Sequence, residues 1–141
     1  MEKMNVLKYA PKLPAAIAYL VLLLLVMLLF FGRKTMSLRP AVIVEQWPDF
    51  YLHVSNFSIS YLMLGGVGFM WILIGIPIRF LVVCGMLLIG CNFIYELWVP
   101  ILNTRDVVDA YYGVAGTILA LCFLLCVKRF GLVPLKKESE T

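Results

Sequence analysis

Four long apolar runs, separated by short polar segments, dominate the chain. They cover residues 13–31, 51–76, 78–98 and 107–127. Each run is long enough to cross a bilayer as a helix, which takes about 20 apolar residues. The pattern therefore predicts an all-α membrane protein, a bundle of four transmembrane helices. Residues 1–12 would precede the bundle, and residues 128–141 would form a basic tail that frays.

Prolines agree with these boundaries. Pro14 falls in the first turn of the first run, where a missing N–H is tolerated. Pro40 and Pro48 interrupt the segment between the first two runs, and Pro77 separates the second run from the third. The first run resembles a signal peptide, but it is too long and lacks a small-residue cleavage pattern. We therefore expect it to remain as the first helix.

Composition narrows the class of protein further. The chain is 63% hydrophobic and 14% charged, whereas soluble domains carry about 25% charged residues. The net charge of +4 comes from residues at segment ends and tails, a placement that suits lipid headgroups and not nucleic acid. All four cysteines lie inside apolar runs and are expected to act as small hydrophobic residues: Cys84, Cys91, Cys122 and Cys126.

Basic residues are divided unequally between the two sides of the predicted bundle. The side with both termini holds eight of them: Lys3, Lys8, Lys12, Arg79, Lys128, Arg129, Lys136 and Lys137. The opposite side holds four: Arg33, Lys34, Arg39 and Arg105. The positive-inside rule then predicts that both termini are cytoplasmic. We expect a multi-pass protein of the inner (plasma) membrane.

Polar residues recur at helical spacing toward the predicted outer side. Separations of 4, 3 and 4 residues join Asp49, His53, Asn56 and Ser60. In the third run Asn92 and Glu96 are four apart, and the fourth run repeats the first spacing in Asp109, Gly113, Gly116 and Ala120. Residues three or four apart share one face of a helix. Polar side chains at membrane depth are costly against lipid, so these faces should turn toward one another.

These faces predict an outward-facing polar pocket. Its candidate ligand-binding residues are Asp49, His53, Asn56, Asn92, Glu96, Arg105 and Asp109. Glu96 and Asp109 are favoured because carboxylates inside a membrane usually serve function. Asp106 is expected to cap the fourth helix, and the small residues are expected to pack against a neighbouring helix: Gly113, Gly116 and Ala120. A purely structural polar cluster remains the alternative.

The sequence holds no strong catalytic signature. There is no HExxH helix, no GxSxG turn and no glycine-rich phosphate loop between a strand and a helix. We therefore expect no catalytic residue, no metal site and no cofactor. A membrane-embedded enzyme that uses His53, the only histidine, and a carboxylate stays open as a weaker alternative.

The spaced polar pattern resembles the VanZ-like family of small bacterial integral membrane proteins, named for a glycopeptide (teicoplanin) resistance factor. Asp49, His53 and Phe57 fit the family's first element, and Glu96 fits a glutamate near the end of a later helix. Arg105 lies at the expected distance after this glutamate, and the last element of the pattern is matched by Asp106, Asp109 and Gly116. The match covers residues 49–120 as a spaced pattern and not as one contiguous motif.

The chain also departs from the family pattern. Val99 stands where a glutamine is expected, Gly113 replaces an asparagine, and Ala120 replaces the final glycine. Val54 stands where the family prefers phenylalanine, and the connection from the arginine to the first aspartate is about two residues short.

The resemblance implies a role in the cell envelope. It would be reduced susceptibility to a glycopeptide or lipopeptide, or binding of a lipid-linked headgroup with Arg105 as the partner of an anion. The implied partners are membrane lipids, a lipid-linked envelope component or another membrane protein, and not nucleic acid. The alternative from a different class is a small accessory subunit of a larger membrane complex, whose Gly116 face would contact a partner helix.

Overall fold

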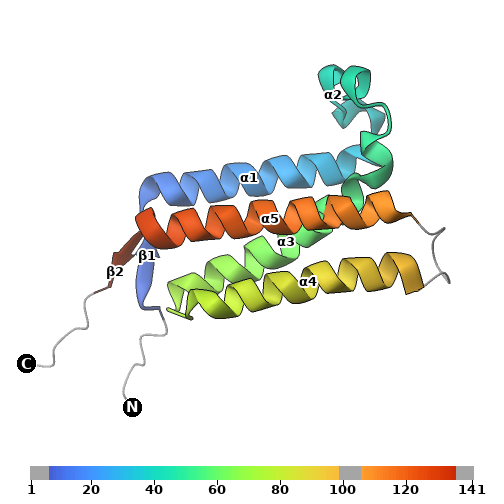
Figure 1. The fold of residues 1–141 in the computed structure, drawn as a ribbon. Coiled ribbons are helices and arrows are strands. Elements are labelled where there is room, and N and C mark those ends of the chain that lie inside the picture. Colours follow the sequence, from blue (N-terminus) through green and yellow to red (C-terminus); the bar gives the residue numbers. More distant parts are fainter. Residues whose placement is uncertain (1–6, 99–105, 136–141) are drawn as a thin grey trace, which may run out of the picture.

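Four long helices run side by side along the molecule (Figure 1). The computed structural model describes residues 7–98 and 106–135. The helices are α1 (Leu13–Gly32), α3 (Phe50–Leu73), α4 (Ile78–Trp98) and α5 (Val107–Phe130). All four are long and apolar enough to cross a membrane. The predicted all-α bundle of four spans is confirmed, and with it the class of multi-pass membrane protein.

Two helix ends differ from the expected spans, each for a local reason. The second span ends at Leu73 because the chain turns at Gly75, whose φ of +83° favours glycine. The fourth span continues to Phe130 and so includes Lys128 and Arg129 in its last turn. Cations are favourable there because they face the negative end of the helix dipole. The tail expected from residue 128 therefore begins later.

A short antiparallel pair of strands closes one end of the bundle. Strand β1 (Tyr9–Pro11) pairs with β2 (Leu132–Pro134), with Ala10 opposite Val133. We did not predict these strands, since three residues carry too little periodicity to be recognised. They place the two segments that flank the bundle next to each other (Figure 1). We call this end the strand end.

The opposite end, where α3 and α5 begin, is called the polar end below. Between α1 and α3 the chain forms a 3₁₀ turn, Met36–Leu38, and the short helix α2 (Ala41–Gln46). Arg39 connects this segment to the bundle. Arg39 donates to the carbonyl oxygens of Gly32 and Arg33, and its guanidinium lies 4.9 Å from the ring centre of Tyr51.

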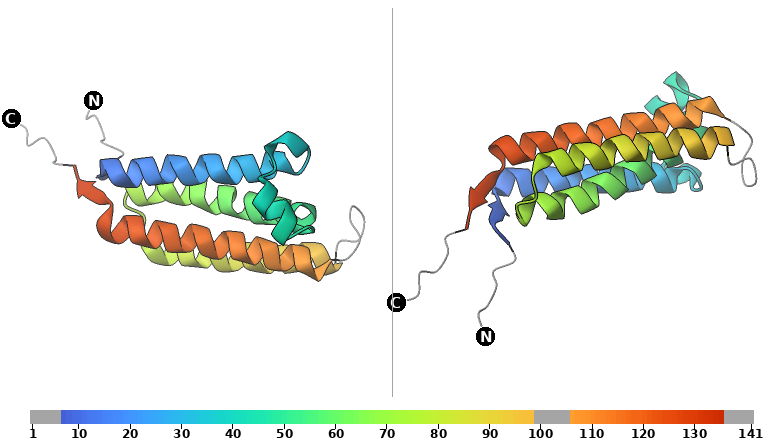
Figure 2. Two further views of the ribbon diagram at one scale, coloured as in Figure 1. Left: turned by 90° about the horizontal axis from the view of Figure 1, so that it is seen from above. Right: turned by 60° about the horizontal axis from the view of Figure 1, so that its bottom comes forward.

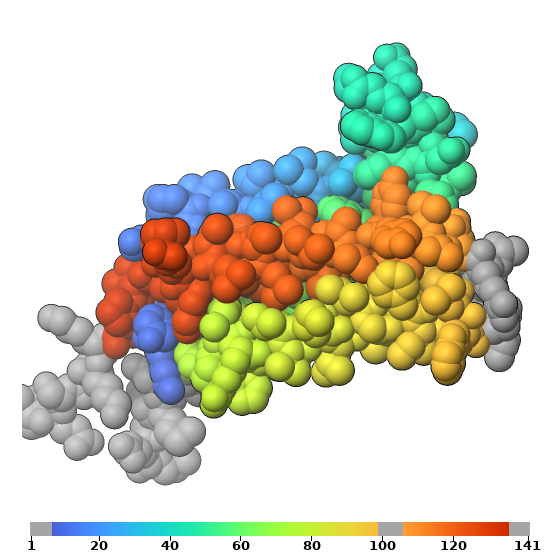
Figure 3. Space-filling model, viewed as in Figure 1, coloured from blue at the N-terminus to red at the C-terminus, as the bar shows by residue number. Residues whose placement is uncertain are grey.

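The two central helices are α3 and α5, with α1 and α4 on the flanks (Figure 2). Half of the α3 span is buried inside the protein, compared with 11% of the α1 span. In Figure 3, α5 and α4 lie against each other along the molecule, with α1 on the other side of α5. Because α3 contacts α4 much less than it contacts α5, these two neighbours in sequence leave a groove between them.

Glycines let the central helices approach closely. A Cβ added at Gly116 would overlap the backbone of Phe57 in α3, and one added at Gly68 would overlap the Leu124 side chain. Ala120 is fully buried in the same contact. Toward the strand end the core is apolar and includes Phe69, on which Tyr19 stacks at 4.0 Å.

Candidate functional site

Side chains from three helices pair with one another near the polar end. His53 Nδ1 of α3 lies 2.8 Å from Asp109 Oδ1 of α5. Nearer the strand end, Asn56 donates to Glu96 of α4 at 2.8 Å, and Asn92 of α4 donates to Ser60 at 3.0 Å. His53 and Ser60 are separated along α3 by about 10 Å at 1.5 Å per residue. The polar network, as we name it, consists of His53, Asn56, Ser60, Asn92, Glu96, Asp106 and Asp109.

His53 faces two carboxylates at the start of α5. Its Nδ1 lies 3.4 Å from Asp106 Oδ2 as well as 2.8 Å from Asp109 Oδ1. The other oxygen of Asp106 accepts a hydrogen bond from the Val108 backbone N–H at 2.9 Å. Asp106 thus occupies the N-cap position and still directs one oxygen toward His53. The ring of Tyr112 lies 5.4 Å from the imidazole and borders the other side of it.

Glu96 is the most deeply buried carboxylate among the described residues, with 3% of its surface exposed. Asn56 donates to Glu96 Oε1. A hydrogen bond to a carboxylate is stronger than a bond between neutral groups, and it offsets part of the cost of removing the charge from water. The two carboxylates and the imidazole at the start of α5 are more exposed: 35% for the Asp106 side chain, 16% for His53 and 14% for Asp109.

Asn92 joins the network at the level of the small-residue face of α5. It donates to the Leu88 carbonyl at 3.0 Å as well as to Ser60. A Cβ at Gly113 would overlap the Asn92 carboxamide, so the absence of a side chain there makes room for the amide. Gly113 was expected only to pack helices together. In the structure it also admits a polar group from α4.

Of the seven residues proposed to line the pocket, five meet in the network: His53, Asn56, Asn92, Glu96 and Asp109. Asp49 is exposed at the N-cap of α3, where its side chain makes no capping hydrogen bond. It shares the helical spacing of the network but lies one turn beyond it. Arg105 lies outside the described residues. The sequence placed Ser60 on the polar face without naming it as a candidate, and the structure pairs it with Asn92.

One polar contact was missed altogether. Arg33, at the end of α1, donates to Ser55 of α3 at 2.6 Å. Ser55 is 6% exposed and lies outside the 4, 3, 4 spacing that identified the polar face. No local pattern relates it to an arginine 22 positions earlier. The contact places a guanidinium on the α1 side of the polar end.

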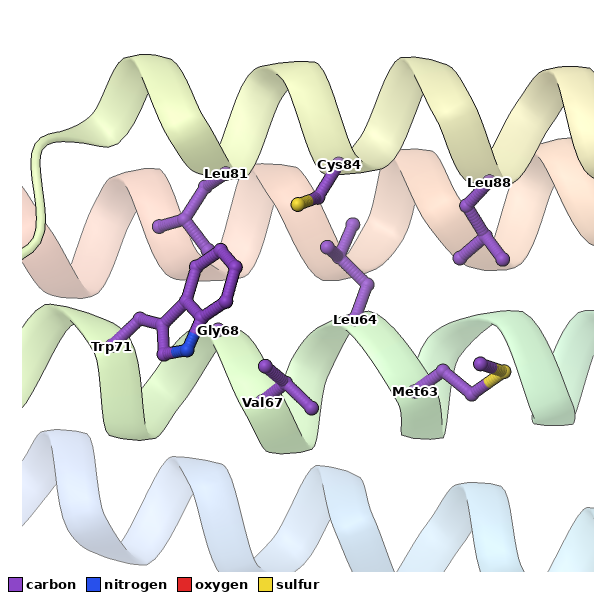
Figure 4. Close-up of a pocket in the computed structure, with 8 residues that line it drawn as sticks. All are labelled: Met63, Leu64, Val67, Gly68, Trp71, Leu81, Cys84 and Leu88. Atoms are coloured by element: carbon purple, nitrogen blue, oxygen red, sulfur yellow. The ribbon is translucent and has the colours of Figure 1, made fainter.

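Two hollows in the described part of the molecule lie away from the network. One, of about 160 Å³, is an apolar groove between α3 and α4, in which Leu64 and Trp71 face Leu81 and Cys84 (Figure 4). The other, of about 330 Å³, lies between α1 and α5 at the strand end. Neither is lined by a network residue. The polar side chains predicted to line the pocket bond to each other.

The arrangement can exchange hydrogen bonds with a polar ligand that enters from the polar end. It offers carboxylate acceptors, amide donors and an imidazole that can do either. Comparisons of the chain with protein-family models, curated proteins and solved structures found no match.

Proposed function

We propose that this chain is a VanZ-like protein of the inner membrane that binds the polar headgroup of a lipid-linked envelope component at its polar end. The buried carboxylate of Glu96, held between transmembrane helices by Asn56, carries the proposal. An ionisable side chain at membrane depth costs stability, and lipid-facing helices pack without one. Such a group is therefore a candidate for binding.

The network suits a headgroup rich in hydroxyl or amide groups. The carboxylates beside His53, Asp106 and Asp109, can accept hydrogen bonds from ligand hydroxyls. The Asn56 side chain can donate or accept a hydrogen bond. A ligand that entered past Asp106 would meet the partly exposed His53 and Asp109 before the buried Glu96. Each intramolecular bond it displaced would be replaced by one to the ligand, so binding need not leave a polar group unpaired.

An anionic part of the headgroup would need a cationic partner. The resemblance assigns this role to Arg105, and Arg33 adds a guanidinium at the same end of the bundle. The positive-inside rule predicts that this end faces outward, where the headgroup of an envelope component would be within reach. Binding there would reduce susceptibility to such an agent.

A packing detail supports the resemblance despite a departure from its pattern. Where the family has asparagine, this chain has Gly113, and the Asn92 carboxamide fills the space that a side chain at that position would need. An amide from α4 therefore lies close to where the pattern would put an amide on α5.

The accessory-subunit alternative relied on the Gly116 face. Gly116 is buried against the backbone of Phe57 within the same chain, so it is not free to contact a partner helix. Co-purification of a stoichiometric membrane partner that survives Gly116 substitutions would favour this alternative through another surface, such as the exposed face of α1.

Susceptibility of a bacterial host to teicoplanin tests the proposal. We expect expression of the wild-type chain to raise the inhibitory concentration, and the Glu96→Gln and Asp109→Asn variants to lose this effect at equal membrane abundance. Glu45→Gln is the matched control, because Glu45 is an exposed carboxylate of α2 outside the network. A doubly substituted Glu96→Gln, Asp109→Asn protein that protects as well as wild type would rule out the proposed site.

A further inference from the structure

An imidazole nitrogen and two carboxylates converge at the start of α5. His53 Nδ1 and one oxygen each from Asp106 and Asp109 all lie within 4.8 Å of one another. The imidazole lies 2.8 Å from one oxygen and 3.4 Å from the other. Neighbouring ligands around a small divalent ion, with bonds of about 2.1 Å, lie roughly 3 Å apart. The two carboxylate oxygens are therefore near the separation from the imidazole nitrogen that one ion requires, and no two of the three donor atoms are more than 4.8 Å apart.

The ligand set is held in place by both helices. His53 projects from the second turn of α3, and its ring is bordered by Tyr112. Asp106 is fixed by the hydrogen bond from Val108 N–H to its Oδ1, which leaves Oδ2 directed at His53. Second contacts of this kind orient metal ligands and contribute to affinity. The ligand set differs from a simple cluster of acidic residues at the start of a helix, because its third donor is the imidazole of His53 from another helix.

The local charge favours a cation. Within residues 7–98 and 106–135, His53 is the one recorded ion-pair partner of either carboxylate. The start of a helix adds only about half a positive charge. Among the described groups, the charge of the two carboxylates therefore exceeds that of the helix start. A divalent ion at this position would offset that negative charge.

We propose that His53, Asp106 and Asp109 bind one divalent cation, Zn²⁺ or Mn²⁺. Imidazole suits Zn²⁺ and carboxylate oxygens suit Mn²⁺, so the mixed set favours these ions over Ca²⁺ or Cu⁺. Three protein ligands leave at least one coordination position for water or a ligand. The sequence led us to expect no metal site, because the one histidine has no HExxH motif around it and Asp109 is 56 positions away from it.

The cation site stands independently of the proposed headgroup site. It needs only the three side chains, and it can be tested with the metal ion alone. One consequence does rest on the proposed function: an ion beside the network would let a phosphorylated headgroup approach the two carboxylates.

Calorimetric titration of Zn²⁺ and Mn²⁺ into purified, metal-stripped protein in detergent tests the site. We expect one ion per chain, and at least a tenfold loss of affinity in Asp109→Asn and in His53→Gln, because each removes a ligand. Glu96→Gln is the control and should bind the ion as wild type does.

Two results would overturn the cation site: no saturable binding at one ion per chain, or equal affinity in wild type and Asp109→Asn. Melting temperatures measured without metal show whether each variant is folded. If the His53→Gln protein does not fold, Asp106→Asn replaces it as the second ligand substitution. The outcomes separate the two proposals. If both proposals are right, Glu96→Gln abolishes protection against teicoplanin without affecting ion binding. If the wild-type protein binds no ion, the cation site is wrong, and the susceptibility test of Glu96→Gln still decides the headgroup proposal.

Discussion

The contact between α3 and α5 has two halves that are both buried but are joined by different interactions. Toward the strand end, the Leu124 side chain fits over Gly68, and Ile72 and Val127 complete an apolar core. Toward the polar end, His53 pairs with Asp109, and the backbone of Phe57 lies against Gly116. One half is joined by shape alone, and the other combines close backbone packing with polar pairs.

The difference between the two halves indicates which side chains the packing of α3 on α5 requires. Lipid tails are as apolar as leucine, so helices in a membrane associate through close packing and hydrogen bonds and gain little from leaving the lipid. The strand-end half shows that this chain can pack α3 on α5 without polar side chains. The carboxylates of the polar half are not needed for packing of the strand-end kind, and this is why we propose that they bind a ligand.

The largest effect is expected for Gly116→Val. The added side chain would overlap the Phe57 backbone, which cannot rotate away as a side chain can. Overpacking typically costs 1–3 kcal/mol and occasionally more, and here we expect about 3 kcal/mol or more together with a low yield of folded protein. Thermal unfolding in detergent measures the loss. Gly66→Val is the control, because nothing lies within 4 Å of a Cβ at Gly66; equal melting temperatures would mean that the contact is not tight.

A smaller loss is expected for Leu124→Ala in the strand-end half. Leu124 is fully buried, and truncating such a leucine typically costs about 2–5 kcal/mol. We expect the lower end of that range, about 2 kcal/mol, because helices in a membrane gain little from leaving the lipid. Leu125→Ala, one residue further at a site 44% exposed, should unfold close to wild type. If the two halves have the roles assigned here, Leu124→Ala lowers the melting temperature but protects cells from teicoplanin wherever the folded protein persists. Loss of protection by a fully folded Leu124→Ala protein would contradict the assignment of function to the polar half alone.

The smallest effect is expected for Ser60→Ala in the polar half. Asn92 loses one acceptor but still donates to the Leu88 carbonyl. Hydrogen bonds between membrane helices contribute about 0.6 kcal/mol on average, and we expect a loss of that order. Ser58→Ala is the control, because the Ser58 hydroxyl is buried without a partner among the described residues and its removal should not destabilise the protein. A loss above about 2 kcal/mol for Ser60→Ala would make the polar half a structural element.

Most of the fold could be predicted from the sequence, because each span is a long apolar run bounded by proline, glycine or charge. Gly75 and the basic end of α5 shifted two boundaries by a few residues. The strands could not be predicted, since Tyr9–Pro11 and Leu132–Pro134 are held by pairing across the whole chain and not by local pattern.

The sequence predicted most residues of the candidate site but not the contacts between them. The 4, 3, 4 spacing placed His53, Asn56 and Ser60 on one face, and that face does meet α4 and α5. Helical periodicity gives the direction of a side chain but not the neighbour it meets. It therefore could not tell that His53 pairs with Asp109, or that Gly113 admits Asn92.

Binding of a defined lipid to the Glu96→Gln variant tests the central claim most directly. The probe is a polyprenyl diphosphate carrying a sugar, compared with the same polyprenyl alcohol, both offered to wild-type and variant protein in lipid nanodiscs. We predict that wild type retains the sugar-bearing lipid, that Glu96→Gln binds it at least tenfold more weakly at nearly unchanged melting temperature, and that the alcohol binds neither. Equal binding of the sugar-bearing lipid by both proteins would contradict the account.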